Sequence, residues 1–189
     1  MIARRHYTFA PMDFAIEKAV ALVEAHRYIQ RFRDKVVVVK VGGSIQEDDE
    51  RMKALLTDVS FMSAVGMRPV IVHGGGKSIT EAMNKAGLKA RFIQGRRFTD
   101  RETLEIAERV LVNEVNKEIV DHLNAAGSYA ISLTSLGSCV LFGEKMQLDG
   151  ASGEKLDLGY VGNVTDVNTV LLEALTEDGY IPVIAPVAV

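Results

Sequence analysis

The spacing of apolar residues changes near residue 34. Before it, apolar residues recur every three to four positions over about residues 13–33, which predicts an amphipathic helix after an irregular lead. After it, the run Lys35–Val41 is nearly continuous and β-branched, as expected of a strand covered on both faces in a parallel sheet. We therefore expect an N-terminal arm over residues 1–34 and an α/β domain over residues 35–189.

Buried strands and amphipathic helices alternate along the rest of the chain. Thr99 with Glu102 fits a capping box for a long helix that ends near Gly127, and Thr165 or Asp166 would cap a later helix. Glycine-rich turns and hairpins are expected over residues 135–163. The other strands expected are Pro69–His73, Tyr129–Leu133 and Tyr180–Ala185, and the other helices are residues 52–66 and 78–86. This alternation predicts a three-layer α/β/α sandwich with a mainly parallel sheet and helices on both faces.

Composition narrows the class of protein. Of 189 residues, 48% are hydrophobic and 25% are charged, which is typical of a soluble globular domain. No apolar run approaches the roughly 20 residues that span a bilayer, and the N-terminus lacks a secretory apolar segment. One cysteine, Cys139, excludes an internal disulfide, and the four histidines show no metal-ligand spacing. We expect a cytoplasmic protein with no metal site and no membrane partner.

Charge separates the two expected parts. The net charge of −3 argues against nucleic acid as the main partner. Residues 1–40 hold eight Lys/Arg against four Asp/Glu, a balance of +4, so the remaining residues carry −7. This asymmetry indicates a separate role for the arm, whose helix either packs on its own domain or docks on another subunit.

Two glycine clusters directly follow two of the expected strands, Gly42-Gly43 and Gly74-Gly75-Gly76. In open α/β sheets, ligands bind beyond the carboxyl ends of the strands, where glycines let backbone N–H groups approach an anion. One such turn is more often ordinary turn chemistry, but two at equivalent strand ends favour an anion site. The run HGGGKS is not a P-loop, because Ile71 stands where that motif needs its first glycine.

Cationic residues lie near these turns in the sequence. Lys40, two residues before Gly42, either keeps its head in water or points into the cleft toward a phosphate, and its position favours the second interpretation. Arg96 and Arg97 are either solvated charges or a fork for a carboxylate, and the pattern leaves open which one faces inward. His73 is interpreted as a strand-end residue rather than a base.

These motifs and three others together resemble one family. The segments VVVVKVGGS, PVIVHGGGKSI, GRRFTD, LDLGYVGNVTDVN and GYIPVIAPV have the order and spacing of the N-terminal half of the acetylglutamate kinases, within the amino acid kinase family. The resemblance covers about residues 28–189. It implies the amino acid kinase fold and transfer of the γ-phosphoryl group of ATP, with Mg²⁺, to the side-chain carboxylate of N-acetyl-L-glutamate in arginine biosynthesis.

The resemblance also implies roles for single residues. Lys40 matches the strand lysine that stabilises the transition state of phosphoryl transfer. The phosphate-binding residues would be Gly42 and Gly43, and the acetylglutamate-binding residues Gly75, Gly76 and Arg97. No general base is needed, since a carboxylate is already ionised at neutral pH.

Two further expectations concern assembly and completeness. Chains of this family continue past the strand in GYIPVIAPV, so the nucleotide site is expected mostly outside this chain. The segment HRYIQRFRDK resembles the N-terminal helix of arginine-inhibited members, which implies L-arginine as inhibitor and a homo-oligomer, either a dimer or a hexamer linked by that helix. The alternatives are a catalytically silent binding or oligomerisation module, and a sister amino acid kinase with another carboxylate substrate.

Overall fold

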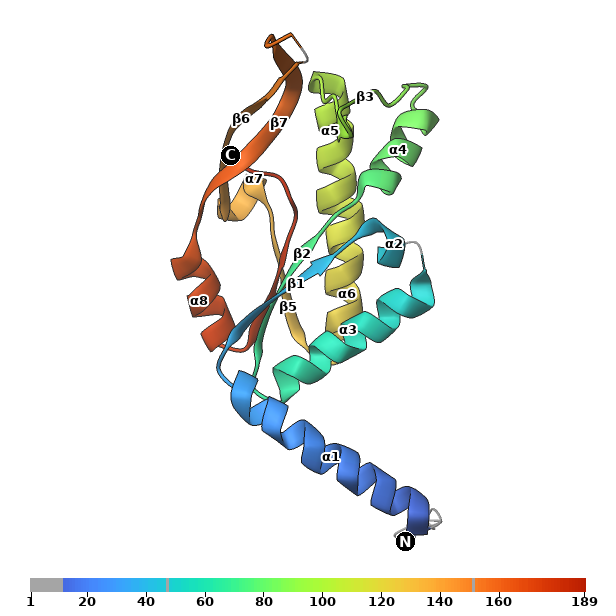
Figure 1. Cartoon of the computed structure of the whole chain (residues 1–189), viewed down its shortest axis with the longest axis vertical. Coiled ribbons are helices and arrows are strands. Elements are labelled where there is room, and N and C mark those ends of the chain that lie inside the picture. The colour runs from blue at the N-terminus through green and yellow to red at the C-terminus, as the bar shows by residue number, and fades with distance from the viewer. Residues whose placement is uncertain (1–11, 47, 151) are drawn as a thin grey trace, which may run out of the picture.

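A four-stranded parallel sheet forms the centre of the molecule (Figure 1). The computed structural model describes residues 12–46, 48–150 and 152–189. The strands lie side by side in the order β1-β2-β8-β5, and all of their pairings are parallel. Their bounds are β1 (Val36–Val41), β2 (Arg68–His73), β5 (Tyr129–Leu133) and β8 (Tyr180–Ile184). All four expected strands are thus present, and their carboxyl ends share one edge.

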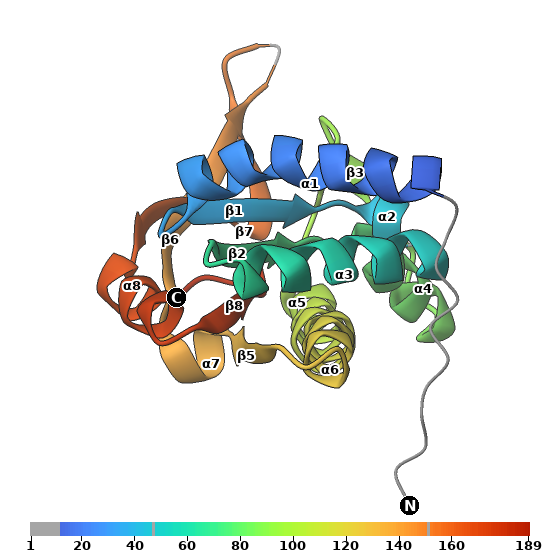
Figure 2. The same ribbon diagram turned by 90° about the horizontal axis from the view of Figure 1, so that it is seen from below.

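Helices pack on both faces of this sheet (Figure 2), which confirms the predicted α/β/α class. The larger core lies between one face of the sheet and a layer of helices that includes Leu56, Leu111 and Leu123. A smaller core on the other face packs the leucines of α8 (Thr169–Glu177) on Val70 and Ile184. The helices of the larger layer are α3 (Asp49–Ala64), α4 (Gly76–Lys85), α5 (Arg101–Arg109), the π-helical η1 (Val110–Asn116) and α6 (Lys117–Ala125).

Strand β1 differs from the expectation of a strand covered on both faces. It pairs only with β2 in the described part of the chain, so it lies at an edge of the sheet. Val39 and Val41 face the larger core, whereas Val36 and Val38 are 48% and 64% exposed. The continuous apolar run correctly predicted a strand, but α8 covers β2 on this face and leaves β1 open.

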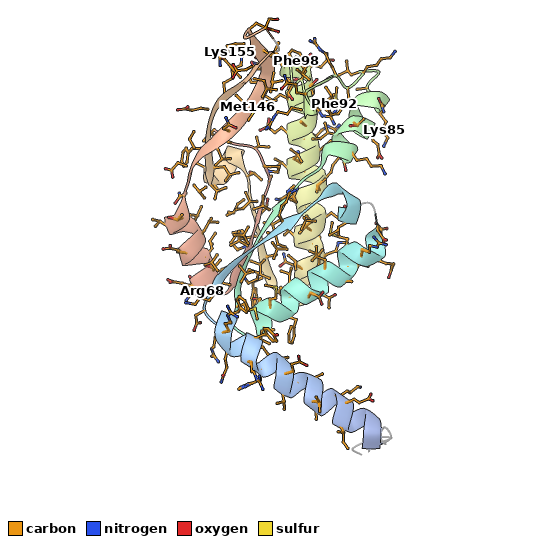
Figure 3. The ribbon with its side chains drawn as sticks, in the orientation of Figure 1. Arg68, Lys85, Phe92, Phe98, Met146 and Lys155 are labelled. Atoms are coloured by element: carbon orange, nitrogen blue, oxygen red, sulfur yellow. The ribbon has the colours of Figure 1, made fainter. Side chains whose placement is uncertain are left out.

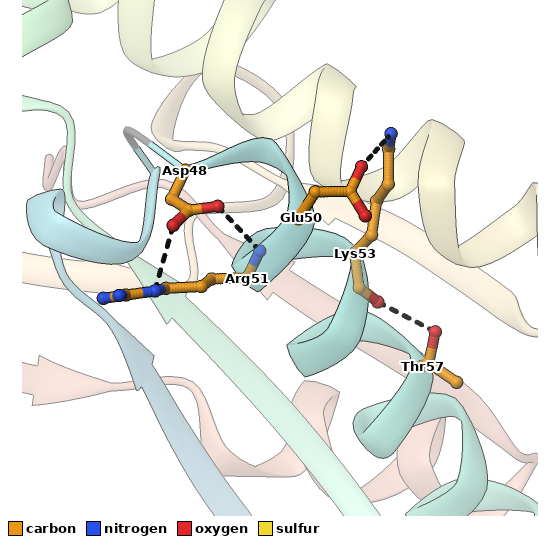
Figure 4. Close-up of polar contacts among 5 residues, drawn as sticks. All are labelled: Asp48, Glu50, Arg51, Lys53 and Thr57. Carbon is orange, nitrogen blue, oxygen red and sulfur yellow. Dashed lines mark hydrogen bonds and ion pairs between the residues drawn. The ribbon is translucent and has the colours of Figure 1, made fainter.

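Polar side chains cap the N-termini of helices α3, α5 and α8. Asp48 accepts a hydrogen bond from the Arg51 amide at the start of α3 and also pairs with its guanidinium (Figure 4). Further along α3, Lys53 pairs with Glu50 and its carbonyl accepts from the Thr57 hydroxyl (Figure 4). The bond from the Arg51 amide satisfies one of the N–H groups that the first turn of a helix leaves without a partner.

Two predicted caps were wrong by one to three residues. The cap of α5 is Asp100, which accepts from the Thr103 amide, rather than Thr99. The cap of α8 is Asn168 rather than Thr165 or Asp166. In both cases the expected residue is held in extended backbone by strand pairing, as described below.

The remaining elements are short or lie beside the sheet. A long antiparallel hairpin covers the region where hairpins were expected, and it stands beside α5 at the end of the molecule opposite α1 (Figure 1). The described residues have no helix both long and apolar enough to cross a membrane. The bounds are α1 (Met12–Phe32), α2 (Gly43–Gln46), β3 (Phe92–Ile93), β4 (Arg96–Arg97), α7 (Ser135–Ser138), β6 (Leu141–Asp149) and β7 (Lys155–Val167).

Helix α1 extends away from the body of the molecule (Figure 1). Its apolar side chains stay in solvent: Val20, Leu22 and Val23 are 61 to 70% exposed. The amphipathic helix was predicted, whereas packing on its own domain, one of the two alternatives, is not observed. The irregular lead expected before it lies outside the described residues.

Candidate functional site

The two glycine turns lie side by side at the carboxyl edge of the sheet. Val41 and His73 are partners in the β1–β2 ladder, and the Gly74 amide donates to the Val41 carbonyl at 2.9 Å. The first turn leads into α2 and the second into α4. A Cβ added at Gly42, Gly43 or Gly76 would meet no atom within 4 Å, so these backbones are open to a ligand.

Gly75 is placed differently from its neighbours. A Cβ added there would lie 2.5 Å from Cδ2 of Leu111 and 3.7 Å from Cγ2 of Val115. Since Cβ atoms essentially never approach this closely, the missing side chain lets η1 pack against the turn. The turn is therefore closed by the π-helical segment at Gly75 and open at Gly76.

Lys40 lies on the open face of β1, next to Val72 of β2. It is exposed, and among the described residues it has no hydrogen bond or ion pair with Arg97 or with the glycine turns. The structure thus places Lys40 two residues before the first turn, on the face of the sheet opposite to η1.

Arg97, and not Arg96, faces inward. Its Nη2 donates to the Gly76 carbonyl at 2.7 Å and to the Thr80 hydroxyl at 2.6 Å, while Nη1 lies 3.2 Å from Sδ of Met83. A guanidinium carries five N–H groups, so two remain for an anion beyond these three contacts in the described chain. The arginine is therefore fixed at the first turn of α4 beside the glycine cluster.

The guanidinium of Arg97 is also held from its other side. Phe92 is its partner across the β3–β4 pair, and the guanidinium carbon lies 4.9 Å from the centre of that ring. Figure 3 shows Phe92 beside the end of α4, at the end of the molecule farthest from α1. Partial burial lowers the pKa of Arg97 from its ordinary value, but arginine keeps its charge in proteins. Stacking and hydrogen bonds together orient a fixed positive charge.

The segment that carries Arg97 is anchored to the long hairpin by backbone pairing. The Thr99 amide donates to the Leu158 carbonyl at 2.9 Å, and the Tyr160 amide donates to the Thr99 carbonyl at 2.6 Å. Gly159, between them, has a φ of 74°, and an added Cβ would collide with the Thr99 carbonyl. Only glycine fits at position 159, where the hairpin passes the Thr99 carbonyl, and this is the physical reason for the glycine between Leu158 and Tyr160.

Comparison with known proteins identifies the family. The sequence model of the amino acid kinase family matches residues 35–189, which is most of the chain. The chain belongs to the amino acid kinase family.

Named relatives are similar to this chain over nearly its full length. It is 40% identical to the acetylglutamate kinase of Caldicellulosiruptor saccharolyticus over 181 residues, covering 96% of this chain and 61% of that protein. It is 46% identical to the acetylglutamate kinase of Moorella thermoacetica over 178 residues, covering 92% of this chain and 60% of that protein. The chain thus spans about three fifths of the length of these relatives.

A solved structure supports the fold. The N-acetylglutamate synthase of Neisseria gonorrhoeae, in complex with coenzyme A and N-acetyl-glutamate, superimposes with a TM-score of 0.74 at 21% identity. The match covers 90% of this chain and 38% of that one. At this identity the likeness concerns the arrangement of helices and strands.

One buried polar cluster of the chain was not predicted. His73 and Asn116 are 2% and 0% exposed, and Asn116 Nδ2 lies 3.1 Å from His73 Nε2 and donates to the Val183 carbonyl at 2.9 Å. His73 Nδ1 lies 2.8 Å from the Gly74 carbonyl. Burial lowers the pKa of His73, and the bond to Gly74 opposes this only in part. A signal existed in the sequence, since Asn116 falls on the apolar stripe that includes Ile119 and Leu123.

Proposed function

We propose that this chain is the substrate-binding part of an acetylglutamate kinase, which transfers the γ-phosphoryl group of ATP to the side-chain carboxylate of N-acetyl-L-glutamate in arginine biosynthesis. The observation that carries the proposal is the 40% and 46% identity to proteins named acetylglutamate kinase over at least 92% of this chain. The arrangement of two glycine turns and one inward arginine agrees with an acceptor that carries two carboxylates.

The proposed roles of the residues follow from where they lie. Arg97 would bind the α-carboxylate of N-acetyl-L-glutamate, and the amides of the second turn, at Gly75 and Gly76, would bind the rest of it. Lys40 with the amides of Gly42 and Gly43 would stabilise the phosphoryl group in transfer. Such a site needs positioning and positive charge rather than a base, because the acceptor is already ionised.

The co-substrate in this proposal is ATP with Mg²⁺. In kinases Mg²⁺ is bound largely by the phosphates of the nucleotide, with one or two carboxylates and water. The residues that the structure describes contain no group of three or more His, Cys, Asp or Glu side chains that could hold a metal. In this proposal the ion is bound through the phosphates of the nucleotide.

Calorimetric titration with N-acetyl-L-glutamate tests the proposal, with L-glutamate as the control ligand. Selective binding of the acetylated ligand is expected. Preference for another carboxylate in a ligand panel would favour a sister amino acid kinase. Binding by a version extended to the length of the relatives, without phosphoryl transfer from MgATP, would favour a silent binding module.

We further propose that α1 mediates self-association of the cytoplasmic protein, as a dimer or hexamer, and that L-arginine inhibits it. Four apolar side chains of α1, Ile16, Val20, Leu22 and Val23, are at least 55% exposed, and a second copy of the chain would cover them. Sedimentation of the chain against its Val20→Glu, Val23→Glu variant checks the first proposal. An unchanged molecular mass would contradict a role for α1, and titration with L-arginine checks the second.

A further inference from the structure

The π-helical segment η1 interrupts what would otherwise be one long helix from α5 to α6. A π-helical turn inside an α-helix is rare and is frequently found at a functional site. This one includes Asn116, which is completely buried, although asparagine is mostly exposed in proteins. A buried amide needs partners, and those partners connect the helix layer to the second glycine turn.

The two backbone carbonyls at the ends of this cluster fix the direction of each hydrogen bond in it. The carbonyls of Val183 and Gly74 can only accept. Asn116 must therefore present its Nδ2 to Val183, because a flipped amide would place oxygen against oxygen. His73 must carry its proton on Nδ1, since Nδ1 faces the Gly74 carbonyl, and its Nε2 then accepts from the second N–H of Asn116.

The same π-helical segment reaches the turn at a second point. Leu111 and Val115 pack where a side chain of Gly75 would be. One contact is thus polar, through His73 to the Gly74 carbonyl, and the other is apolar, at Gly75. Both act on the inner side of the turn, while Gly76 on the outer side has open space around it.

We propose that His73 is a positioning residue: Asn116 holds its ring at Nε2, and its Nδ1 holds the Gly74 carbonyl so that the amides of Gly75 and Gly76 stay aimed at the acceptor substrate. The inference rests on the proposed function, because it assigns the purpose of the turn to that substrate. His73 is then neither a base nor a ligand of the substrate. It acts through the peptide groups that follow it.

Two substitutions of His73 separate positioning from simple stability. In His73→Asn, the amide N–H replaces the Nδ1–H group and still donates to Gly74, whereas His73→Leu removes that donor. Both variants lose the link to Asn116 and both leave space in the core. Leu123→Ala, in α6, is the matched control for loss of packing away from the turn.

The first measurement is nuclear magnetic resonance of the 189-residue chain. Long-range proton–nitrogen spectra should show the neutral His73 ring protonated on Nδ1, and the amide signals of Gly75 and Gly76 should shift or broaden in His73→Leu but stay near the parent positions in His73→Asn and Leu123→Ala. A ring protonated on Nε2, or glycine amides that do not respond to His73→Leu, would overturn the proposal.

The second measurement is the affinity for N-acetyl-L-glutamate by calorimetry, below the unfolding transition of each variant. We expect His73→Leu to bind about tenfold more weakly, with His73→Asn and Leu123→Ala near the parent value. Equal affinity of His73→Leu and the parent would contradict positioning. If the parent itself does not bind while the spectra behave as expected, the proposed function fails for this chain and the positioning of the turn stands.

Discussion

Replacing Gly75 by alanine tests whether the absence of a side chain at this position serves the packing of η1 against the turn. The new Cβ would lie 2.5 Å from Cδ2 of Leu111, whereas ordinary contacts begin near 3.4 Å, so the leucine must move by about 1 Å. Leu111 is 6% exposed within the larger core and has little room to do so. Overpacking of this kind costs about 1–3 kcal/mol of unfolding free energy.

Urea unfolding followed by circular dichroism measures this cost, and Gly76→Ala is its control. Alanine at Gly76 meets no atom within 4 Å at the start of α4, so its stability should stay within about 1 kcal/mol of the parent. Leu111→Ala alone should cost about 2–5 kcal/mol, but at least about 1 kcal/mol less in the Gly75→Ala background, since it relieves the clash. Additive losses, or a Gly76→Ala variant no more stable than Gly75→Ala, would refute the packing role.

Three other predictions concern charge, pH and backbone. Arg97→Ala should weaken binding of N-acetyl-L-glutamate by about 10- to 150-fold in calorimetry, while Arg96→Ala, which removes an exposed charge, leaves it nearly unchanged; equal effects would contradict the inward role. The buried His73 has a pKa below its ordinary 6.5, so the unfolded chain takes up the proton first, and stability should be constant above that pH and fall below it. Urea midpoints from pH 7 to 5 should show that slope, at most about 1.4 kcal/mol per pH unit, in the parent and a smaller slope in His73→Asn; identical slopes would exclude this histidine as the cause. Gly159→Ala should lower the free energy of unfolding by more than about 2 kcal/mol, because the new Cβ collides with the Thr99 carbonyl and alanine is strained at this positive φ. Gly153→Ala, which has a positive φ but open space around it, should lose about 1 kcal/mol. Equal losses in urea unfolding would show that the collision has no effect.

The order of the main strands and helices along the chain could be predicted from hydrophobic periodicity and glycines. Apolar runs predicted all four sheet strands, and glycines marked the ends of α4 and α6. The carboxyl ends of parallel strands share one edge, so the sequence placed both glycine clusters at that edge, whereas their adjacency came from the pairing of β1 with β2. The choice between Arg96 and Arg97 came only from the resemblance, and the structure gives its physical basis in the cross-strand pair with Phe92.

The wrong predictions all depend on pairing between distant segments. Thr99 is extended because it pairs with the hairpin at Gly159, so the next residue, Asp100, becomes the cap. Thr165 and Asp166 belong to β7 through its pairing with β6, which moves the next cap to Asn168. Local sequence does not encode these partners.

Two other features lie beyond local pattern. An edge strand and a central strand have the same apolar run, so the open face of β1 became visible only with the strand order. The π-helical turn in η1 changes the register of a helix without a composition signal of its own. The sequence signal for this segment was Asn116, a polar residue on the apolar stripe of the helix.

The hydrogen bond between the Gly74 amide and the Val41 carbonyl has a consequence for how acceptor preference can vary. Neighbouring strands lie about 4.8 Å apart, so the ladder itself sets the separation of the two turns. A phosphoryl group on one turn and a carboxylate on the other would meet at a distance that no side-chain rotamer controls. Under the proposed function, substitutions in β3 and β4, which carry Phe92 and Arg97, would change the acceptor preference while the reaction distance is preserved.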